Sequence, residues 1–591
     1  MQGLDIAVLD FGGQYVFNIR RVLLEKGFNA EIVPYDVSPD RLRGVKGVIL
    51  SGGPYSVYDE DAPLCDPAIL RLGVPVLGLC YGHQAIAYLL GGEVKKGRVG
   101  EYGFSEVSVD TSNRLFRGLK EREICWMSHG DVVSKLPPGF KVIASSDESP
   151  IAAFQGEDRI FGLQFHPEVS HTPNGHRILE NFAELCGCPR GSWDIKAFID
   201  AAIKDISAKV GSEKAIIAVS GGVDSTTAAA LASRALGDRL TCVHVNHGLM
   251  RKDESEEVVK LLKDVGLNPL YIDAEEKFLN ALRGAFRPDD KRRVIGRLFI
   301  EEFERVASEV GARWLIQGTI APDVIESTRG EARRRSDRGH GGLIKIHHNV
   351  AGLPKGMELK LIEPLSPLFK YQVRALARGL GLPRELTERQ PFPGPGLGCR
   401  ISGGITKAKL RLLREVNEIV EDELAAYKPS QYFAILLTGR VKARSSEAES
   451  IASKYLGRRV RAYQLMDEAV GVKGDERVTG NPICVSVNDD PRILDGLPWI
   501  NLLKMQNEIT GAIREVCRVL IQVNGSIGLE RRGYGIAIRA VETLDFMTAT
   551  PCEVSFIHLS EVGGEILERF NGISFICYEI TTKPAATIEL I

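Results

Sequence analysis

Short apolar runs that end in glycine-rich turns and lead into helical stretches recur along this chain, and they constrain its fold most strongly. Near the N-terminus such runs cover residues 6–9, 48–50 and 74–79. Runs of β-branched residues that alternate with helical segments are typical of a parallel sheet covered by helices. We therefore expect the chain to begin with a parallel α/β domain.

A second series of the same kind follows a group of turn-forming residues at 188–192. Its expected strands are 215–219, 240–245 and 314–317, and its expected helices are 225–236 and 254–265. The series ends at 390–396, where three prolines and two glycines interrupt any helix or strand. This second segment predicts another parallel α/β domain.

The remainder of the chain mixes amphipathic helical patterns with strands, which predicts an α+β domain. The helical patterns cover 407–424 and 499–519, and the strands cover 535–541 and 573–580. At about 100 to 200 residues per domain, a chain of 591 residues has room for three such blocks. The predicted domains are 1–190, 191–391 and 392–591.

Composition narrows the class of partner. The chain has 75 Lys and Arg residues against 77 Asp and Glu, so its formal net charge of −2 argues against a general nucleic-acid binder. No apolar run approaches the roughly 18 residues of a membrane span, and the first residues do not resemble a signal peptide. The eleven cysteines show no zinc-site spacing. We expect a cytoplasmic protein with neither nucleic acid nor membrane as its partner.

The first chemical motif places Cys80 between an apolar strand and a helix. Gly78 and Gly82 flank it at positions minus two and plus two. A nucleophile on a tight strand-to-helix turn requires small neighbours, and the helix N-terminus favours a thiolate. Taken alone, Cys80 also fits a buried core thiol.

The segment His166-Pro167-Glu168 supplies a proton shuttle for such a thiolate. Residues two apart in an extended segment share a face, and the proline keeps the segment extended. Glu168 can therefore orient the ring of His166, although His166 alone also fits an ordinary strand-end histidine. Candidate oxyanion donors are the backbone N–H groups of Gly53 and Tyr81. Together these residues predict covalent acyl transfer.

The second motif is a glycine turn between a strand and a helix. Its residues are Ser220, Gly221, Gly222, Val223, Asp224, Ser225 and Thr226. Backbone amides and hydroxyls converge on an anion at such a turn, and the chain has no Walker loop. The string Ser-Gly-Gly-x-Asp-Ser resembles the loop of enzymes that split ATP into AMP and pyrophosphate. That resemblance implies ATP as co-substrate and Mg²⁺ as cofactor, with Asp224 as a candidate metal carboxylate.

A basic, mostly polar segment at 328–342 follows the expected strand at 314–317. It fits a solvated loop equally well as a lid that closes over nucleotide phosphates. In the lid interpretation, Asp323 and Glu326 reach the metal or Lys345.

Two families share these motifs. Gly78 to Gln84 and His166 to Glu168 resemble the signature of class I glutamine amidotransferases, which implies that glutamine is hydrolysed through a thioester on Cys80. Four longer strings resemble the GMP synthetase family, in its domain order. These strings are 318–327, 345–349, 391–397 and 583–589.

The GMP synthetase resemblance implies the fold and the second reaction. The fold is then a class I amidotransferase domain, an ATP-pyrophosphatase domain of the adenine nucleotide α-hydrolase type, and an α+β C-terminal domain. The substrates are glutamine, ATP and xanthosine monophosphate (XMP), and the products include GMP. The resemblance also implies that XMP contacts Asp475, Arg477, Lys583 and Glu589. A homodimer through the C-terminal domain is also implied.

Some residues depart from the family pattern. Gly13 stands where the family usually has Ser, Asn246 stands where related enzymes carry Asp, and the third block is longer than the common bacterial form. Two alternatives stay open at this point: another ATP-pyrophosphatase that modifies a tRNA base or a dinucleotide precursor, and an inactive glutamine-sensing scaffold.

Overall fold

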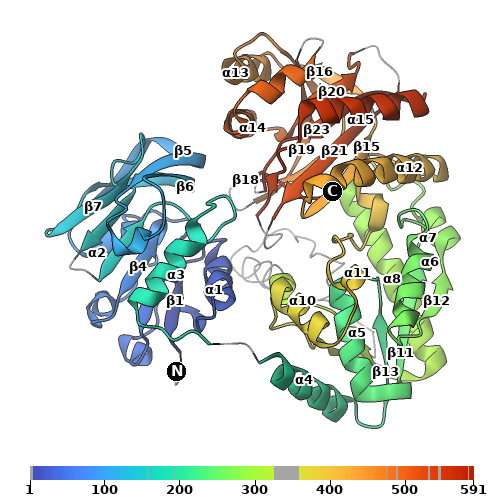
Figure 1. Ribbon diagram of the computed structural model, residues 1–591, viewed down its shortest axis with the longest axis horizontal. Coiled ribbons are helices and arrows are strands. Elements are labelled where there is room, and N and C mark those ends of the chain that lie inside the picture. Colours follow the sequence, from blue (N-terminus) through green and yellow to red (C-terminus); the bar gives the residue numbers. More distant parts are fainter. Residues whose placement is uncertain are drawn as a thin grey trace. The chain divides into compact units, whose positions relative to one another are not determined.

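The computed structural model divides the chain into two compact units, Met1–Trp193 and Asp194–Ile591 (Figure 1). It describes residues 4–156, 159–191, 194–324, 359–473, 476–487, 490–529, 533–543, 548–583 and 585–590. For residues 98–100, 102, 472–473 and 476–477 it describes the backbone alone. The three-domain division predicted above stays a prediction.

The first unit is built on one nine-stranded sheet of order β2-β1-β3-β4-β9-β8-β7-β5-β6. Strands β2, β1, β3, β4 and β9 run parallel, as the sequence predicts. The strands are β1 (Ile6–Asp10), β2 (Ala30–Pro34), β3 (Gly47–Leu50), β4 (Val76–Leu79), β5 (Glu93–Val109), β6 (Arg122–Lys135), β7 (Phe140–Ser145), β8 (Ala153–Gly156) and β9 (Ile160–Leu163). The helices are α1 (Val16–Glu25), α2 (Tyr81–Leu89) and α3 (Gly175–Leu185).

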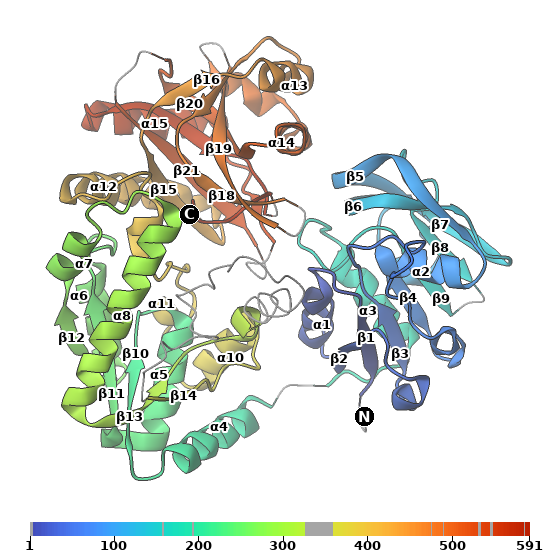
Figure 2. The ribbon, with the colours of Figure 1, turned by 180° about the vertical axis from the view of Figure 1, so that it is seen from behind.

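Alternation along the parallel strands gives this sheet two apolar faces. Ile6 and Val8 belong to a core cluster that includes residues of α1 and α3, whereas Ala7 and Leu9 belong to a second cluster that includes residues of α2. Successive side chains of a strand point to opposite faces, so α1 and α3 cover one face and α2 covers the other. Figure 2 shows the same unit from behind.

The antiparallel half of this sheet is not part of the sequence-based prediction. Strands β5 and β6 form a long hairpin at the edge of the sheet. Strands β8 and β7 lie between the last parallel strand, β9, and this hairpin. Strands β6 and β7 mix buried with exposed or partly exposed residues and lack the uninterrupted apolar runs of the parallel strands, so they give a weaker signal.

The second unit contains a five-stranded parallel sheet of order β12-β11-β10-β13-β14. Its strands are β10 (Lys214–Ala218), β11 (Leu240–Asn246), β12 (Leu270–Asp273), β13 (Ala312–Ile316) and β14 (Lys360–Ile362). Its helices are α4 (Ile195–Val210), α5 (Val223–Leu236), α6 (Glu254–Asp264), α7 (Glu275–Ala281), α8 (Pro288–Val310), α10 (Lys370–Gly379) and α11 (Arg384–Thr387).

The same unit also contains a mixed ten-stranded sheet whose main path is β15-β21-β23-β20-β19-β17-β16. Its strands are β15 (Gln431–Leu437), β16 (Val441–Arg444), β17 (Arg461–Leu465), β18 (Ala469–Lys473), β19 (Glu476–Ser486), β20 (Val516–Gly525), β21 (Tyr534–Glu542), β22 (Thr550–Pro551), β23 (Ile573–Glu579) and β24 (Ala585–Ala586). Its helices are α12 (Lys407–Leu424), α13 (Ser446–Leu456), α14 (Trp499–Ala512) and α15 (Phe556–Arg569).

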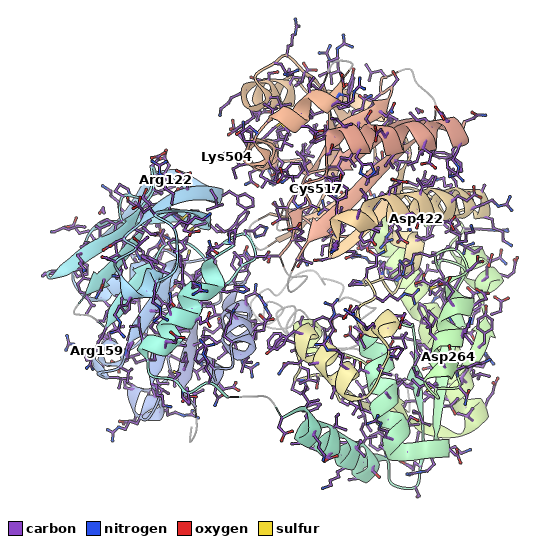
Figure 3. All side chains as sticks on the ribbon, in the orientation of Figure 1. Arg122, Arg159, Asp264, Asp422, Lys504 and Cys517 are labelled. Atoms are coloured by element: carbon purple, nitrogen blue, oxygen red, sulfur yellow. The ribbon has the colours of Figure 1, made fainter. Side chains whose placement is uncertain are left out.

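Burial distinguishes the sheet from the helices that cover it, as the side chains in Figure 3 illustrate. Cys517 is buried in β20, whereas Asp422 of α12 and Lys504 of α14 are exposed.

One apolar cluster contains residues of β11 and α8 together with residues of α12, β15 and β20. The two sheets of the second unit therefore share a continuous core, which explains why they form one compact unit.

One expected helix is too long. The predicted helix 499–519 ends at Ala512, and Val516 begins strand β20. The run from Val516 to Val523 is rich in β-branched residues, and its backbone pairs with β19 and β23.

The predicted fold class is otherwise confirmed: two α/β parts with parallel strands and an α+β part. None of the helices in the described ranges is long and apolar enough to cross a membrane.

Candidate active sites

Cys80 lies on the tight turn that the sequence predicts. It follows β4 and precedes α2, with φ 52° and ψ −105°, a conformation that non-glycine residues rarely adopt. A Cβ atom on Gly78 would overlap the carbonyl oxygen of Gly82, and one on Gly82 would overlap that of Leu50. Both glycines are therefore sterically required for the turn.

His166 and Glu168 form a buried pair beside Cys80. Nδ1 of His166 lies 2.8 Å from Oε1 of Glu168, and the two side chains are 5% and 0% exposed. Burial by itself lowers the pKa of His166, but the Glu168 charge and the Cys80 sulfur raise that pKa to about 10. The imidazole is therefore protonated at neutral pH, and Nδ1–H donates to Glu168. An imidazolium at this place stabilises negative charge on the sulfur.

The backbone around His166 is held by its neighbours. Its N–H donates to the carbonyl oxygen of Trp126 at 3.0 Å, and the Thr172 hydroxyl donates to its carbonyl oxygen at 2.6 Å. The Tyr15 ring meets the imidazole edge-on, with centroids 5.0 Å apart. The ring is thus fixed before any substrate binds.

The Gly52-Gly53 turn packs directly against this pair. A Cβ atom on Gly52 would lie 3.1 Å from Cε1 of His166 and 3.6 Å from Cβ of Cys80. Glycine therefore leaves room for a substrate beside the sulfur. The roles of the Gly53 and Tyr81 N–H groups as oxyanion donors stay a prediction.

Gly13 packs against the same turn. A Cβ atom on Gly13 would overlap the carbonyl oxygen of Gly52, so the turn as it stands has no room for the serine that the family resemblance implies at this position.

Several residues of the first site have no recognisable motif in the sequence. The Asp131 carboxylate is buried and accepts hydrogen bonds from the Ser56 hydroxyl at 2.5 Å and the Tyr58 hydroxyl at 2.8 Å. Nε2 of Gln164 lies 3.9 Å from the Cys80 sulfur. Asp131 thus fixes the loop after Gly53, a role that only the folded chain reveals.

The glycine turn of the second unit lies between β10 and α5. Ser225 donates to the carbonyl oxygen of Gly222 at 3.1 Å, and the Ser220 and Ser225 hydroxyls are 3.1 Å apart. Gly221 has φ 79°, and a Cβ atom on Gly318 would lie 2.8 Å from the carbonyl carbon of Asp224. The end of β13 therefore supports the turn, which sits at the carboxyl edge of the sheet, where ligands of open α/β sheets bind.

Asp224 has a partner that the sequence does not predict. Its Oδ2 lies 2.5 Å from Nζ of Lys370, the first residue of α10. Its Oδ1 is buried and has no hydrogen-bond partner among the described residues. An unpaired carboxylate oxygen is a suitable donor for Mg²⁺, which commonly takes one or two carboxylates plus substrate phosphates. The described residues contain no cluster of three or more metal-ligating side chains.

The predicted XMP contacts are only partly described. Glu589 accepts two hydrogen bonds from Arg400, both at 2.9 Å, and one from Gln431 at 2.8 Å. Lys583 pairs with Ala549 through its backbone, and its side chain is half-buried. Asp475 lies outside the described residues, and of Arg477 only the backbone in β19 is described.

Of the three predicted lid residues, the structure describes Asp323 alone. The Asp323 carboxylate accepts a hydrogen bond from the Ile320 N–H at 3.1 Å, which stabilises the turn after β13. Glu326 and Lys345 lie outside the described residues. Asn246, the departure noted after β11, donates to the Tyr271 hydroxyl at 3.0 Å and accepts from the Gly248 N–H, so its side chain stabilises the local turn.

Comparison with known proteins identifies the family. The chain is 40% identical over 600 residues to GMP synthase (glutamine-hydrolyzing) from Caldicellulosiruptor saccharolyticus, with all of both chains covered. It is 40% identical to the proteins of the same name from Clostridium kluyveri and Carboxydothermus hydrogenoformans, with 99% of each chain covered. The chain belongs to the glutamine-hydrolysing GMP synthase family.

Family models match separate parts of the chain. The class-I glutamine amidotransferase model matches residues 7–186, and the GMP synthase C-terminal domain model matches residues 524–590. The NAD synthase model matches residues 195–297, which contain the glycine turn of the second unit. The enzyme thus combines a glutamine amidotransferase sheet, a parallel ATP-pyrophosphatase sheet and a C-terminal mixed sheet. The full-length similarity disfavours the two alternatives left open by the sequence.

Proposed function

We propose that Cys80 attacks the side-chain amide carbon of glutamine and forms a thioester. His166 protonates the leaving ammonia, and Gly53 and Tyr81 donate their N–H groups to the oxyanion. Water then attacks the thioester, His166 accepts its proton, and glutamate leaves. The charged pair of His166 and Glu168 beside a strained Cys80 supports this assignment.

We propose that the second unit uses this ammonia. The loop Ser220–Thr226 holds the phosphates of ATP, and the C2 oxygen of XMP attacks the α-phosphorus, so that pyrophosphate leaves. Ammonia then displaces AMP from C2 and yields GMP. Lys370 and Asp224 flank the phosphates, and Mg²⁺ held by Asp224 would neutralise charge on them.

XMP itself is proposed to contact Asp475, Arg477, Lys583 and Glu589. Cationic Lys583 and Arg477 suit a 5′-phosphate, and carboxylates suit ribose hydroxyls or base N–H groups. Asp323, Glu326 and Lys345 are proposed to act at the lid over the adenylylated intermediate. A homodimer through the C-terminal part and a cytoplasmic location complete the proposal.

The observation that carries this function is that one chain holds both a Cys80-His166-Glu168 centre and a Ser220–Thr226 loop with Asp224 at its helix. The test supplies purified protein with ATP, Mg²⁺, XMP and either glutamine or an ammonium salt, and follows GMP and pyrophosphate. We expect one pyrophosphate per GMP with both nitrogen sources. Absence of GMP with both would refute the proposal.

A further inference from the structure

A groove of about 530 Å³ runs along α10 in the second unit. One wall is α10, with Lys370, Arg374 and Arg378, and the opposite wall includes Tyr432 of β15 and Thr543 after β21. Residues four apart on a helix share a face, so the three basic side chains follow one another at intervals of one turn.

The charges of this groove are not balanced. Lys370 is paired with Asp224, and Glu388, which also lines the groove, is paired with Arg384. Arg374 and Arg378 have no ion pair among the described residues, and Nε of Arg374 is buried there without a hydrogen-bond partner. Two uncompensated guanidinium groups on one helix face favour an anion.

The groove begins at the ATP loop. Helices α5 and α10 lie side by side and parallel, because Asp224 contacts Lys370 near their N-termini and Arg234 donates to the Leu380 carbonyl oxygen near their C-termini at 2.7 Å. Helical side chains lean toward the N-terminus, so Arg374 leans toward Lys370, and Arg378 leans toward Arg374. The basic side chains therefore lead away from the loop that is proposed to hold the phosphates of ATP.

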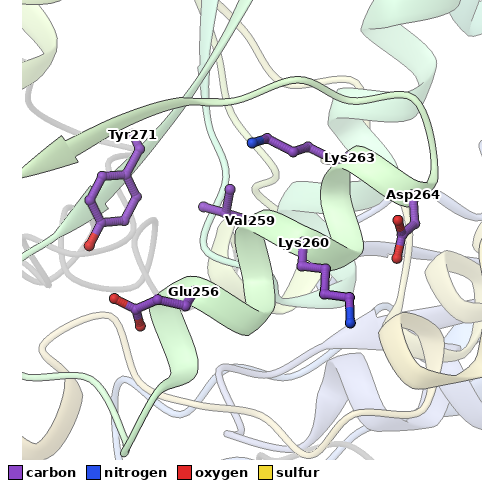
Figure 4. Close-up of a pocket in the computed structure, with 6 residues that line it drawn as sticks. All are labelled: Glu256, Val259, Lys260, Lys263, Asp264 and Tyr271. Atoms are coloured by element: carbon purple, nitrogen blue, oxygen red, sulfur yellow. The ribbon is translucent and has the colours of Figure 1, made fainter.

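A second hollow in this unit shows a different charge pattern (Figure 4). The hollow of about 560 Å³ beside α6 and Tyr271 has two lysines, Lys260 and Lys263, against Glu256 and Asp264. Its formal charge is balanced, so it offers an anion no comparable attraction. Of these two hollows, the groove that starts at Lys370 is the one with excess positive charge.

We propose that the α10 groove binds inorganic pyrophosphate after it leaves the ATP loop, with Arg374 and Arg378 as its ligands. This inference rests on the proposed reaction, which releases pyrophosphate beside Lys370. Guanidinium groups form paired hydrogen bonds with phosphoryl oxygens, and a groove open to solvent lets the product depart. The nucleotide 5′-phosphate of XMP has the same chemistry, and the experiment separates the two ligands.

The test uses the full-length protein and the variants Arg374→Met and Arg378→Met, with Arg297→Met, at an exposed position of α8, as a control. Isothermal titration measures the affinity for magnesium pyrophosphate, and steady-state assays with ammonium chloride measure KM for XMP and ATP. We expect each groove variant to weaken pyrophosphate binding by about tenfold or more, with KM for XMP changed less than about twofold. The control should match wild type.

Pyrophosphate affinity within about twofold of wild type in both groove variants would overturn the proposal. A tenfold rise in KM for XMP with unchanged pyrophosphate affinity would also overturn it, because the groove would then hold the nucleotide phosphate. Arg378 is exposed, so its variant tests the idea even if Arg374→Met does not fold. Failure of the reaction itself is distinguished by wild type, which would then form no GMP.

Discussion

Replacing Glu168 by Gln tests whether a carboxylate holds His166 in its charged form. The variant keeps the shape of the side chain and removes its charge 2.8 Å from Nδ1. The Gln amide nitrogen would occupy the place of Oε2, a buried atom without a hydrogen-bond partner among the described residues. The substitution therefore removes an ion pair and adds an unsatisfied donor.

The size of the effect follows from Coulomb's law. Two unit charges about 4 Å apart interact by about 4 kcal/mol at an effective dielectric constant of 20, which corresponds to roughly three powers of ten in protonation. Lowering a pKa of about 10 by roughly three pK units leaves the pKa of His166 at about 7 in the variant. At pH 7.5 most molecules then lose the imidazolium, and no carboxylate orients the ring. Because both the charge and the orientation of the acid-base group are lost, we expect glutaminase activity to fall by about 100-fold or more.

The pH dependence has a defined sign. The folded-state pKa of His166 lies above its ordinary value of 6.5, so the charged pair stabilises the first unit below pH 6.5. That stabilisation decreases as the pH rises above 6.5 and is lost through about pH 10. In Glu168→Gln this pH-dependent loss of stability should disappear.

The assay follows glutamate release from pH 6 to 10, together with chemical unfolding of the purified protein. GMP synthesis with an ammonium salt, which does not need Cys80, serves as the internal control and should be unchanged. If Glu168→Gln keeps glutaminase activity within about threefold of wild type at pH 7.5, with the same pH profile, the proposed role of Glu168 is wrong.

Three further predictions concern the two sites. Cys80→Ala should lower glutamine-dependent GMP synthesis by about a thousandfold or more and leave ammonium-dependent synthesis within about twofold of wild type; loss of both activities would contradict separate sites. Asp224→Ala should lower pyrophosphate release by about 100-fold or more with either nitrogen source, and retained release would mean that the loop is structural. Glu589→Ala leaves the buried Arg400 without its counter-charge, so the free energy of unfolding of the second unit should fall by about 3 kcal/mol, measured by urea titration. An unchanged unfolding midpoint would show that the pair contributes no stability.

Local signals identify the parts of both sites that depend on neighbouring residues. The turn at Cys80 needs small residues two positions away on each side, and the sequence shows Gly78 and Gly82 there. The contact between His166 and Glu168 follows from their spacing in an extended segment. Helix α12 matches its predicted range, because an amphipathic pattern of that length is clear without tertiary context.

Only the tertiary structure decides the contacts between distant segments. Lys370 reaches Asp224 across 146 residues, and Arg400 reaches Glu589 across 189, and neither pair has a sequence motif. The long antiparallel hairpin of the first unit and the end of α14 before β20 also depend on which strands pair. The sequence by itself determined the chemical groups and the turns that present them, since these depend on local backbone geometry. Packing determined which distant charges neutralise one another, because that depends on how the helices and sheets assemble.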